Sequence, residues 1–238
     1  VTEEVLAAAR LGFDCAWLAE HHFSTEYGIM PDVWVYAGYL AALTKRIKLG
    51  MAVVTLPLAN PVRVVENAAF VDILSGGRVA LGLGSGYRKY EFDGFGLDFE
   101  ARRDMQDEAL AIIQDLLRTR RTNRKGKYFT AVVESPYELL PQPVQKPYPQ
   151  CWEPVASARS VEWAAAHGVN CNINAIPRTR LRKVFETYHQ AAEQAGWPDR
   201  LQRGAFKFGW DAEKRRGLSV GPWVHILTPG DEQAQLAR

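Results

Sequence analysis

The stretch that decides the fold is Cys15-Ala16-Trp17-Leu18-Ala19-Glu20-His21-His22-Phe23, an apolar run that ends in a cluster of polar and ring side chains. The run lacks the alternation of a strand with one wet face, which predicts a strand buried on both faces of a parallel sheet. An amphipathic helix precedes it, with Thr2 placed to cap its first turn and Gly12 placed to end it. Helix, tight turn, strand and polar cluster form one unit of an α/β barrel, whose chemistry lies at the carboxyl ends of the strands.

The two imidazoles at this strand end are expected to play unequal roles. Neighbouring strand residues point to opposite faces, so only one of His21 and His22 faces a central site unless the chain already turns there. From these residues alone, two hypotheses fit equally well: a half-buried histidine pair with satisfied hydrogen bonds, and a catalytic role.

Composition is that of an ordinary α/β protein. The chain has 238 residues, of which 47% are hydrophobic and 24% charged, enough for a sizeable core in one domain spanning 1–238. Its net charge of +2 gives no electrostatic case for binding nucleic acid or a membrane surface. We see no signal peptide and no apolar run of the roughly 18 residues that a membrane helix needs. Three widely separated cysteines, Cys15, Cys151 and Cys171, indicate reduced core residues of a cytoplasmic protein.

Helix and strand patterns alternate along the chain, which favours a parallel sheet with crossover helices. We expect helices at 32–43, 60–75, 101–117, 160–167 and 178–195, and strands at 47–56, 78–83, 152–156, 169–174 and 224–227, with another helix from Pro229. The predicted class is an α/β, TIM-like (β/α)₈ barrel that is incomplete in this chain, with one strand expected before Val1 and an eighth after Arg238. An open doubly wound sheet is the alternative, although no dinucleotide-binding turn supports it.

Two segments are candidate anion or ring sites. Small residues in Gly82-Leu83-Gly84-Ser85-Gly86 let a ring or phosphate approach the backbone, although a simple tight turn explains them equally well and the spacing is not the dinucleotide fingerprint. Ser157-Ala158-Arg159-Ser160 leads from a strand into a helix, where hydroxyls, backbone N–H groups and the helix dipole suit a phosphate. Ordinary N-capping explains these serines as well.

A basic cluster follows the long helix at 101–117. Its members are Arg118, Arg120, Arg121, Arg124, Lys125 and Lys127. Cations near a helix carboxyl end and a solvated loop explain it better than phosphate binding does.

Several of these segments together resemble the bacterial luciferase-like monooxygenase family. The matching motifs, in order, are Gly12-Phe13-Asp14, Trp17 to Phe23, Arg46 to Gly50, Leu56-Pro57-Leu58, Asn60 to Arg63, Asp72 to Arg78, Gly82 to Tyr87, Pro141 to Pro147 and Ser157 to Ala165. The resemblance spans nearly the whole chain. It implies a TIM-like barrel that binds flavin mononucleotide (FMN) at the carboxyl face and lets the reduced flavin react with O₂.

The resemblance also implies site residues. His21 matches the family's catalytic histidine, with Glu20 and His22 in supporting positions, and Ala52-Val53 falls where relatives have a cis peptide under the flavin ring. Gly84 and Ser85 match flavin-binding positions, and Ser157, Ala158 and Ser160 match the phosphate site. Gly84, Ala156 and Ala175 replace a cysteine, a glutamate and a tryptophan of luciferase, which argues against light emission. We expect helix-to-strand ion pairs and turn structure at Asp72, Glu66 and Arg78.

The function expected from the resemblance is oxygenation of a small organic substrate by reduced FMN and O₂. A separate NAD(P)H-dependent flavin reductase would supply the reduced FMN, and the protein would be a dimer. Three alternatives stay open: a deazaflavin-dependent hydride-transfer oxidoreductase, a non-catalytic flavin-binding protein, and a zinc hydrolase barrel. Five histidines, at 21, 22, 167, 189 and 225, supply the zinc ligand set of the last poorly. The sequence leaves the substrate undetermined.

Overall fold

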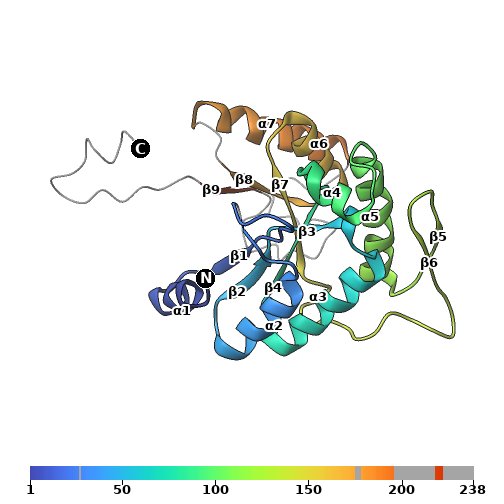
Figure 1. Ribbon diagram of the computed structural model, residues 1–238. Helices are drawn as coiled ribbons and strands as arrows, with labels where there is room; N and C mark the ends of the chain where they lie inside the picture. The colour runs from blue at the N-terminus through green and yellow to red at the C-terminus, as the bar shows by residue number, and fades with distance from the viewer. Residues whose placement is uncertain (27, 175–177, 196–217, 222–238) are drawn as a thin grey trace.

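Parallel strands build the centre of the molecule, in a computed structural model that describes residues 1–26, 28–174, 178–195 and 218–221 (Figure 1). The main sheet has seven strands, six of which follow the order β1-β2-β4-β7-β8-β9, while β3 pairs with β4. These strands are β1 Cys15–Leu18, β2 Lys48–Met51, β3 Val54–Thr55, β4 Val79–Gly84, β7 Gln150–Val155, β8 Asn170–Asn174 and β9 Leu218–Gly221. Within the described residues the sheet is a curled, open path of parallel strands, the larger part of a barrel.

Helices form the outer layer. They are α1 Thr2–Leu11, α2 Val33–Leu43, α3 Pro61–Ser75, α4 Lys89–Phe95, α5 Arg102–Thr119, α6 Ala158–His167 and α7 Arg178–Gln194, with a short 3₁₀ turn, η1, at Leu56–Leu58. Figure 1 shows α2, α3, α5, α6 and α7 around the outside of the sheet. No helix in the described part of the chain is both long and apolar enough to cross a membrane.

Local sequence explains most helix ends. Asp32 Oδ1 accepts hydrogen bonds from the first-turn nitrogens of α2, and Asn60 Oδ1 does the same for α3. Gly76 and Gly168 end α3 and α6 with φ near 70°, a left-handed conformation that glycine adopts without steric cost. The expectation that Thr2 caps α1 is wrong, because Val1 is the N-cap and the Thr2 hydroxyl bonds the Tyr36 hydroxyl at 2.8 Å instead.

One buried cluster joins the strands to the helices. Leu49, Leu81 and Cys171 come from the strands, and Leu40 and Leu110 come from α2 and α5. Burying such side chains contributes about 1.5–3 kcal/mol each, so the helix layer is fixed mainly by apolar packing. The first strand differs from its prediction, since only one of its four residues is fully buried and it ends the described strand order.

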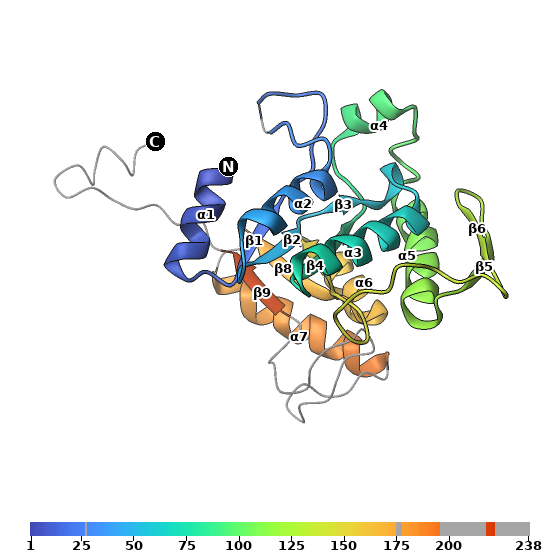
Figure 2. The same ribbon diagram turned by 90° about the horizontal axis from the view of Figure 1, so that it is seen from below.

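Several elements differ from those expected. The segment 47–56 forms two strands instead of one, with the cis peptide Ala52-Val53 between them. The loop expected near Gly94 contains α4, and the basic cluster lies partly in a hairpin of β5 (Thr122–Lys125) and β6 (Thr130–Val133), which projects beyond the helices in Figure 2. The expected strand at 224–227 and the helix from Pro229 lie outside the described residues.

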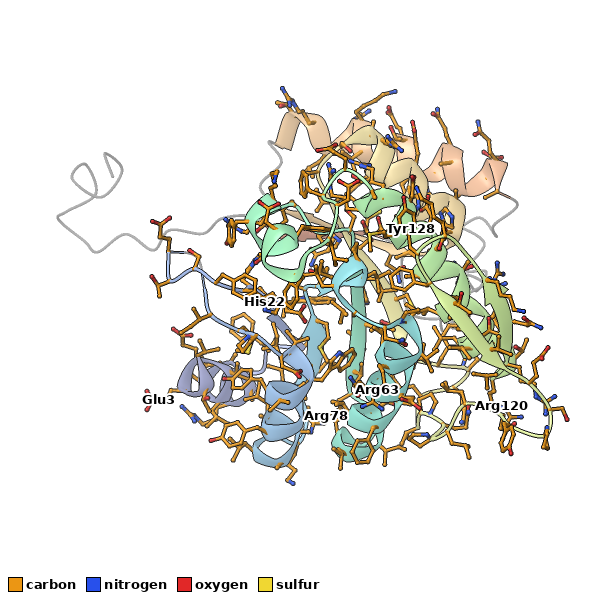
Figure 3. The ribbon with its side chains drawn as sticks, turned by 45° about the vertical axis from the view of Figure 1, so that its right-hand side comes forward. Glu3, His22, Arg63, Arg78, Arg120 and Tyr128 are labelled. Carbon is orange, nitrogen blue, oxygen red and sulfur yellow. The ribbon has the colours of Figure 1, made fainter. Side chains whose placement is uncertain are left out.

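Helix-to-strand ion pairing and turn structure are expected of Asp72, Glu66 and Arg78. Among the described residues the ion pairing is wrong, whereas Arg78 does take part in the turn after α3, where its N–H donates to Ser75 Oγ. Arg78 donates to Thr44 Oγ1 and to four backbone carbonyls, those of Ala41, Thr44, Ile47 and Ser75. Asp72 instead accepts hydrogen bonds from the backbone and side chain of Gln145 and from Val79 N, tying the proline-rich crossing to β4. Glu66 pairs within α3 with Arg63. In Figure 3, Arg78 lies low on the molecule by α2, far from His22.

Candidate active site

The loop after β1 places His21 at the wall of a cavity of about 420 Å³. His21 N–H donates to Met30 O at 3.1 Å, so the loop folds back and holds this backbone in position. Only 8% of the residue is exposed. The cavity is lined from β1, β2–β3, β4, α4 and β7, at the carboxyl ends of the strands, where α/β barrels keep their chemistry.

Glu91 of α4 anchors both histidines. Its Oε1 lies 3.0 Å from His21 Nδ1 and accepts a hydrogen bond from His22 N at 2.9 Å. Glu91 is 2% exposed, so this carboxylate is held away from water. A carboxylate on Nδ1 favours the tautomer with the proton on Nδ1, which leaves the Nε2 lone pair of the neutral ring available for proton transfer. That Nε2 lies 3.4 Å from the Tyr87 hydroxyl.

His22 lies outside the set of residues that line this cavity. Its ring packs edge-on against Phe95 at 4.9 Å, and Figure 3 shows it close to α4. Its Nε2 lies 3.4 Å from Glu20 Oε1. Burial lowers the pKa of His22, whereas burial, followed by the charges of Asp32 and Glu91, raises the pKa of Glu20 to about 8. Near pH 7 this pair is therefore largely uncharged, with the Glu20 carboxylic acid at the cavity wall.

The floor of the cavity is built from two backbone segments in close contact. Ala52 and Val53, joined by the cis peptide, line it beside Gly84 and Ser85 at the end of β4. A Cβ on Gly84 would collide with the side chain of Val53, and one on Gly82 would collide with Met51 O. These two glycines are therefore required by the approach of β2 and β3 to β4, a packing reason that the sequence analysis did not identify.

A second cavity, of about 340 Å³, adjoins the first along Ser85, Gly86, Tyr87, Glu153, Pro154 and Ala156, which line both. The start of α6 lines it through Ser157, Arg159 and Ser160, and α5 adds Arg102 and Arg103. Backbone N–H groups of a first helical turn and three guanidinium groups suit an anion. The acidic residues among its lining are Asp107 and Glu153.

The two serines expected at a phosphate site also cap α6. Ser157 Oγ accepts from Ser160 N at 3.2 Å, and Ser160 Oγ accepts from Ser157 N at 3.1 Å, a reciprocal capping box. Helix capping and a place at the anion site are therefore compatible, because the same residues cap the helix and line the cavity. Ala158, the remaining residue expected here, is the first of the helix and lies between two lining residues.

The structure gathers the predicted residues into one region. His21, Glu20, Ala52, Val53, Gly84 and Ser85 line the first cavity, and Ser85, Ser157 and Ser160 line the second. Sequence reasoning missed Glu91, Arg102, Arg103 and Glu153. Glu91 lies 70 residues from His21 in an unexpected short helix, and Glu153 lies in a run that otherwise reads as a buried strand. A charged residue inside an apolar strand pattern was the available signal for Glu153.

The residues fit a flat, phosphate-bearing cofactor. Each cavity has the size of a small-molecule site, and the two share six lining residues. One contains the glycine at the end of β4, and the other has cationic side chains and the start of a helix in its wall. For metal ions, the described part of the chain contains no group of three or more His, Cys, Asp or Glu side chains that could hold one. His225, one of the five histidines, lies outside the described residues.

Solved structures share this fold. Monooxygenase RslO1 from Streptomyces bottropensis superposes with a TM-score of 0.81 at 24% identity, over 99% of this chain and 69% of that one. The oxygenating constituent of 3,6-diketocamphane monooxygenase from Pseudomonas putida, in complex with FMN, gives a TM-score of 0.75 at 22% identity, over 84% and 58%. An F420-dependent secondary alcohol dehydrogenase gives 0.72 at 22%, over 82% and 60%.

The chain is also similar in sequence to other proteins. The chain is 34% identical over 174 residues to the uncharacterized protein y4vJ of Sinorhizobium fredii, covering 73% of this chain and 48% of that protein. It is 30% identical over 186 residues to the alkanal monooxygenase alpha chain of Photorhabdus luminescens, covering 78% and 50%. The chain therefore spans about half the length of these relatives. A family model described as luciferase-like monooxygenase matches residues 1–209. The chain belongs to the luciferase-like monooxygenase family.

Proposed function

We propose that this protein is a flavin-dependent monooxygenase that uses reduced FMN and O₂ to oxygenate a small organic substrate. The observation that carries the proposal is the pair of adjoining cavities, one bearing the buried His21 and the other bearing the arginines and the start of α6. Membership of the luciferase-like family supports it, as does the FMN complex of one structural relative. Bound reduced FMN would supply the electrons that activate O₂, a reaction that protein side chains alone do not perform.

The residues of this chain then have separate tasks. Ser157, Ser160 and the arginines of the second cavity would hold the phosphate, and the floor at Ala52, Val53 and Gly84 would hold the ring. His21, oriented by Glu91, would accept or donate a proton at Nε2. The buried part of the wall, at His21, Glu91 and Glu153, would keep water away from the reacting groups.

Oxygen labelling tests this proposal. Purified protein is given reduced FMN, ¹⁸O₂ and a panel of aldehydes, ketones, sulfonates and amines, and products are analysed by mass spectrometry. We expect one ¹⁸O atom in the product of at least one substrate class. Retention of reduced FMN with no labelled product from any class would favour the non-catalytic flavin-binding alternative.

A second candidate is hydride transfer with a deazaflavin. The likeness of the fold to an F420-dependent secondary alcohol dehydrogenase is the observation that favours it. The two candidates differ in their need for oxygen. Anaerobic turnover of an alcohol with coenzyme F420, together with no labelling from ¹⁸O₂, would support the deazaflavin enzyme over the monooxygenase.

Two partners belong to the proposal. A separate NAD(P)H-dependent flavin reductase would supply reduced FMN, so adding one should sustain multiple turnovers. We also propose a dimer, since α2 is apolar all round yet exposes Val35 and Tyr39, and the neighbouring helix α3 exposes Phe70 and Leu74. Sedimentation should show two copies for the wild type and one for Tyr39→Lys combined with Phe70→Lys, and a monomeric wild type would contradict the proposed dimer.

A further inference from the structure

Glu153 is a buried carboxylic acid at the junction of the two cavities. It lies in the middle of β7, opposite Cys171 of β8, and lines both cavities. Only 6% of the residue is exposed. Its neighbours along the strand, Cys151 and Val155, belong to the apolar core, so a carboxyl group at this position needs an explanation beyond packing.

Glu153 accepts a hydrogen bond from a neutral amide. Gln106 Nε2 of α5 donates to Glu153 Oε2 at 2.9 Å. The charged or titratable groups that act on it are Arg103 and Asp107 from α5 and Cys171 from β8, and Arg102, Arg159 and Tyr87 line the same second cavity. Burial raises the pKa of Glu153 to about 8, against the smaller lowering effects of Gln106 and Arg103. The carboxyl group is therefore neutral at pH 7 and titrates within the range in which the protein can be studied.

The two protonation states differ in what the second cavity can hold. Neutral Glu153 adds no negative charge to a cavity that is also lined by the cations of Arg102, Arg103 and Arg159, and its protonated carboxyl group can donate a hydrogen bond. Ionised Glu153 places a negative charge at the wall of the same cavity and repels a phosphate dianion. In a buried site, this repulsion is screened less than it would be at the surface.

We propose that Glu153 is a specificity-determining residue that couples binding of a phosphate-bearing cofactor in the second cavity to retention or uptake of one proton. The proposal rests on the proposed function, since it takes FMN as the occupant of the two cavities. Coupling is reciprocal, so a bound phosphate favours neutral Glu153 and neutral Glu153 favours the phosphate. A cofactor without phosphate should be indifferent to the state of Glu153.

The affinity for FMN should fall as the pH rises. Below pH 8 Glu153 is neutral and FMN binding is at its strongest; as the pH rises through 8 the carboxyl ionises and binding weakens. Because one proton is involved, the Kd for FMN can rise by at most about tenfold per pH unit. The FMN phosphate becomes a dianion near pH 6, so between pH 7 and 9.5 its own charge hardly changes.

The test compares oxidised FMN with riboflavin, which share the ring and differ in the phosphate. Their Kd values are measured by flavin fluorescence between pH 7 and 9.5 at constant ionic strength, for wild type and Glu153→Gln. Glutamine keeps the shape and can still accept from Gln106. Asp107→Asn is the matched control, because it removes a different carboxyl group from the same cavity wall.

We expect the wild-type Kd for FMN to rise at least fivefold between pH 8 and 9.5, while the Kd for riboflavin stays within twofold. Glu153→Gln should flatten the FMN profile, whereas Asp107→Asn should change affinity without flattening it. An FMN profile equally steep in Glu153→Gln would overturn the inference alone. Failure of the wild type to bind FMN in either its oxidised or its reduced form at any pH would overturn the proposed function along with it.

Proton counting on the wild type gives a second measurement that needs no variant. Calorimetry of FMN binding in buffers of different ionisation enthalpy reports the protons taken up. We expect an uptake approaching one proton at pH 9 and close to zero at pH 7. Zero uptake at both values would overturn the inference even if Glu153→Gln did not fold.

Discussion

Glu91 Oε1 lies 3.0 Å from His21 Nδ1, and this contact joins a helix after β4 to the loop after β1. The same oxygen accepts the backbone N–H of His22 at 2.9 Å. One buried carboxylate therefore fixes the tautomer of His21 and the backbone N–H of the residue that follows it, which is how a general acid or base is usually held for its task.

Glu91→Gln should lower kcat by roughly 10- to 100-fold with little change in KM, because a hydrogen bond to a charged group contributes about 1.5–3 kcal/mol. The pH–rate profile should also move, since the charge beside His21 is lost. Asp93→Asn is the control on the same helix, where the exposed pair with Lys89 contributes little. A fall in thermal stability with unchanged kcat and pH profile would make Glu91 a purely structural residue.

His21→Ala should reduce turnover by roughly 10²–10⁴, the usual scale for a lost general acid or base, and leave the affinity for reduced FMN nearly unchanged. His22→Ala should act mainly on stability, because its ring packs against Phe95 away from the cavity. Single-turnover kinetics with preformed reduced FMN separates the two effects. If His22 carried the rate effect and His21 did not, the assignment of the histidines would be reversed.

Sequence periodicity predicted most of the outer layer because caps and stops are local. The helices expected at 60–75 and 160–167 are found at Pro61–Ser75 and Ala158–His167, and they end at Gly76 and Gly168. The barrel-like arrangement came from the alternation of helices and strands and from the family resemblance. What the sequence did not reveal was α4, whose seven residues are too few for a clear periodic pattern.

The candidate site was predictable only in part for a similar reason. His21 and the serines after β7 follow strands, so their positions could be inferred from the fold. Glu91 and Gln106 act through partners 70 and 47 residues away, and pairing over such distances is set by the tertiary structure alone. The steric reason for Gly84 is likewise set by the tertiary structure. A Cβ at this position would meet the side chain of Val53, which directly precedes the strand β3 that pairs with β4.

Ser157→Asp and Ser157→Asn form a pair that separates capping from phosphate binding. Both side chains are good N-caps, so thermal stability should stay close to that of the wild type for each. The aspartate adds a negative charge to the second cavity and should weaken FMN binding at least tenfold, whereas asparagine should not. Riboflavin affinity should be the same in both variants. Equal FMN affinity for the two would place the phosphate elsewhere.

Gly84→Ala and Gly38→Ala should change stability in opposite directions. A Cβ at Gly84 meets the side chain of Val53 in a packed region, which should cost about 1–3 kcal/mol and distort the cavity floor. Gly38 lies inside α2 with open space around its Cβ direction, so alanine should stabilise the helix by about 0.5–1 kcal/mol. Denaturant unfolding monitored by circular dichroism measures both. A neutral Gly84→Ala would show that β3 can move away from β4.

The proposed monooxygenase activity is tested most directly by the fate of ¹⁸O₂ in wild-type protein and in His21→Ala, each supplied with reduced FMN and the substrate panel. For the wild type we expect one labelled oxygen atom per product molecule. For the variant we expect product formation to be slowed by at least about 10²-fold at similar reduced-FMN occupancy. Product that carries no ¹⁸O, or that forms equally well without oxygen, would contradict the assignment of this protein as a monooxygenase.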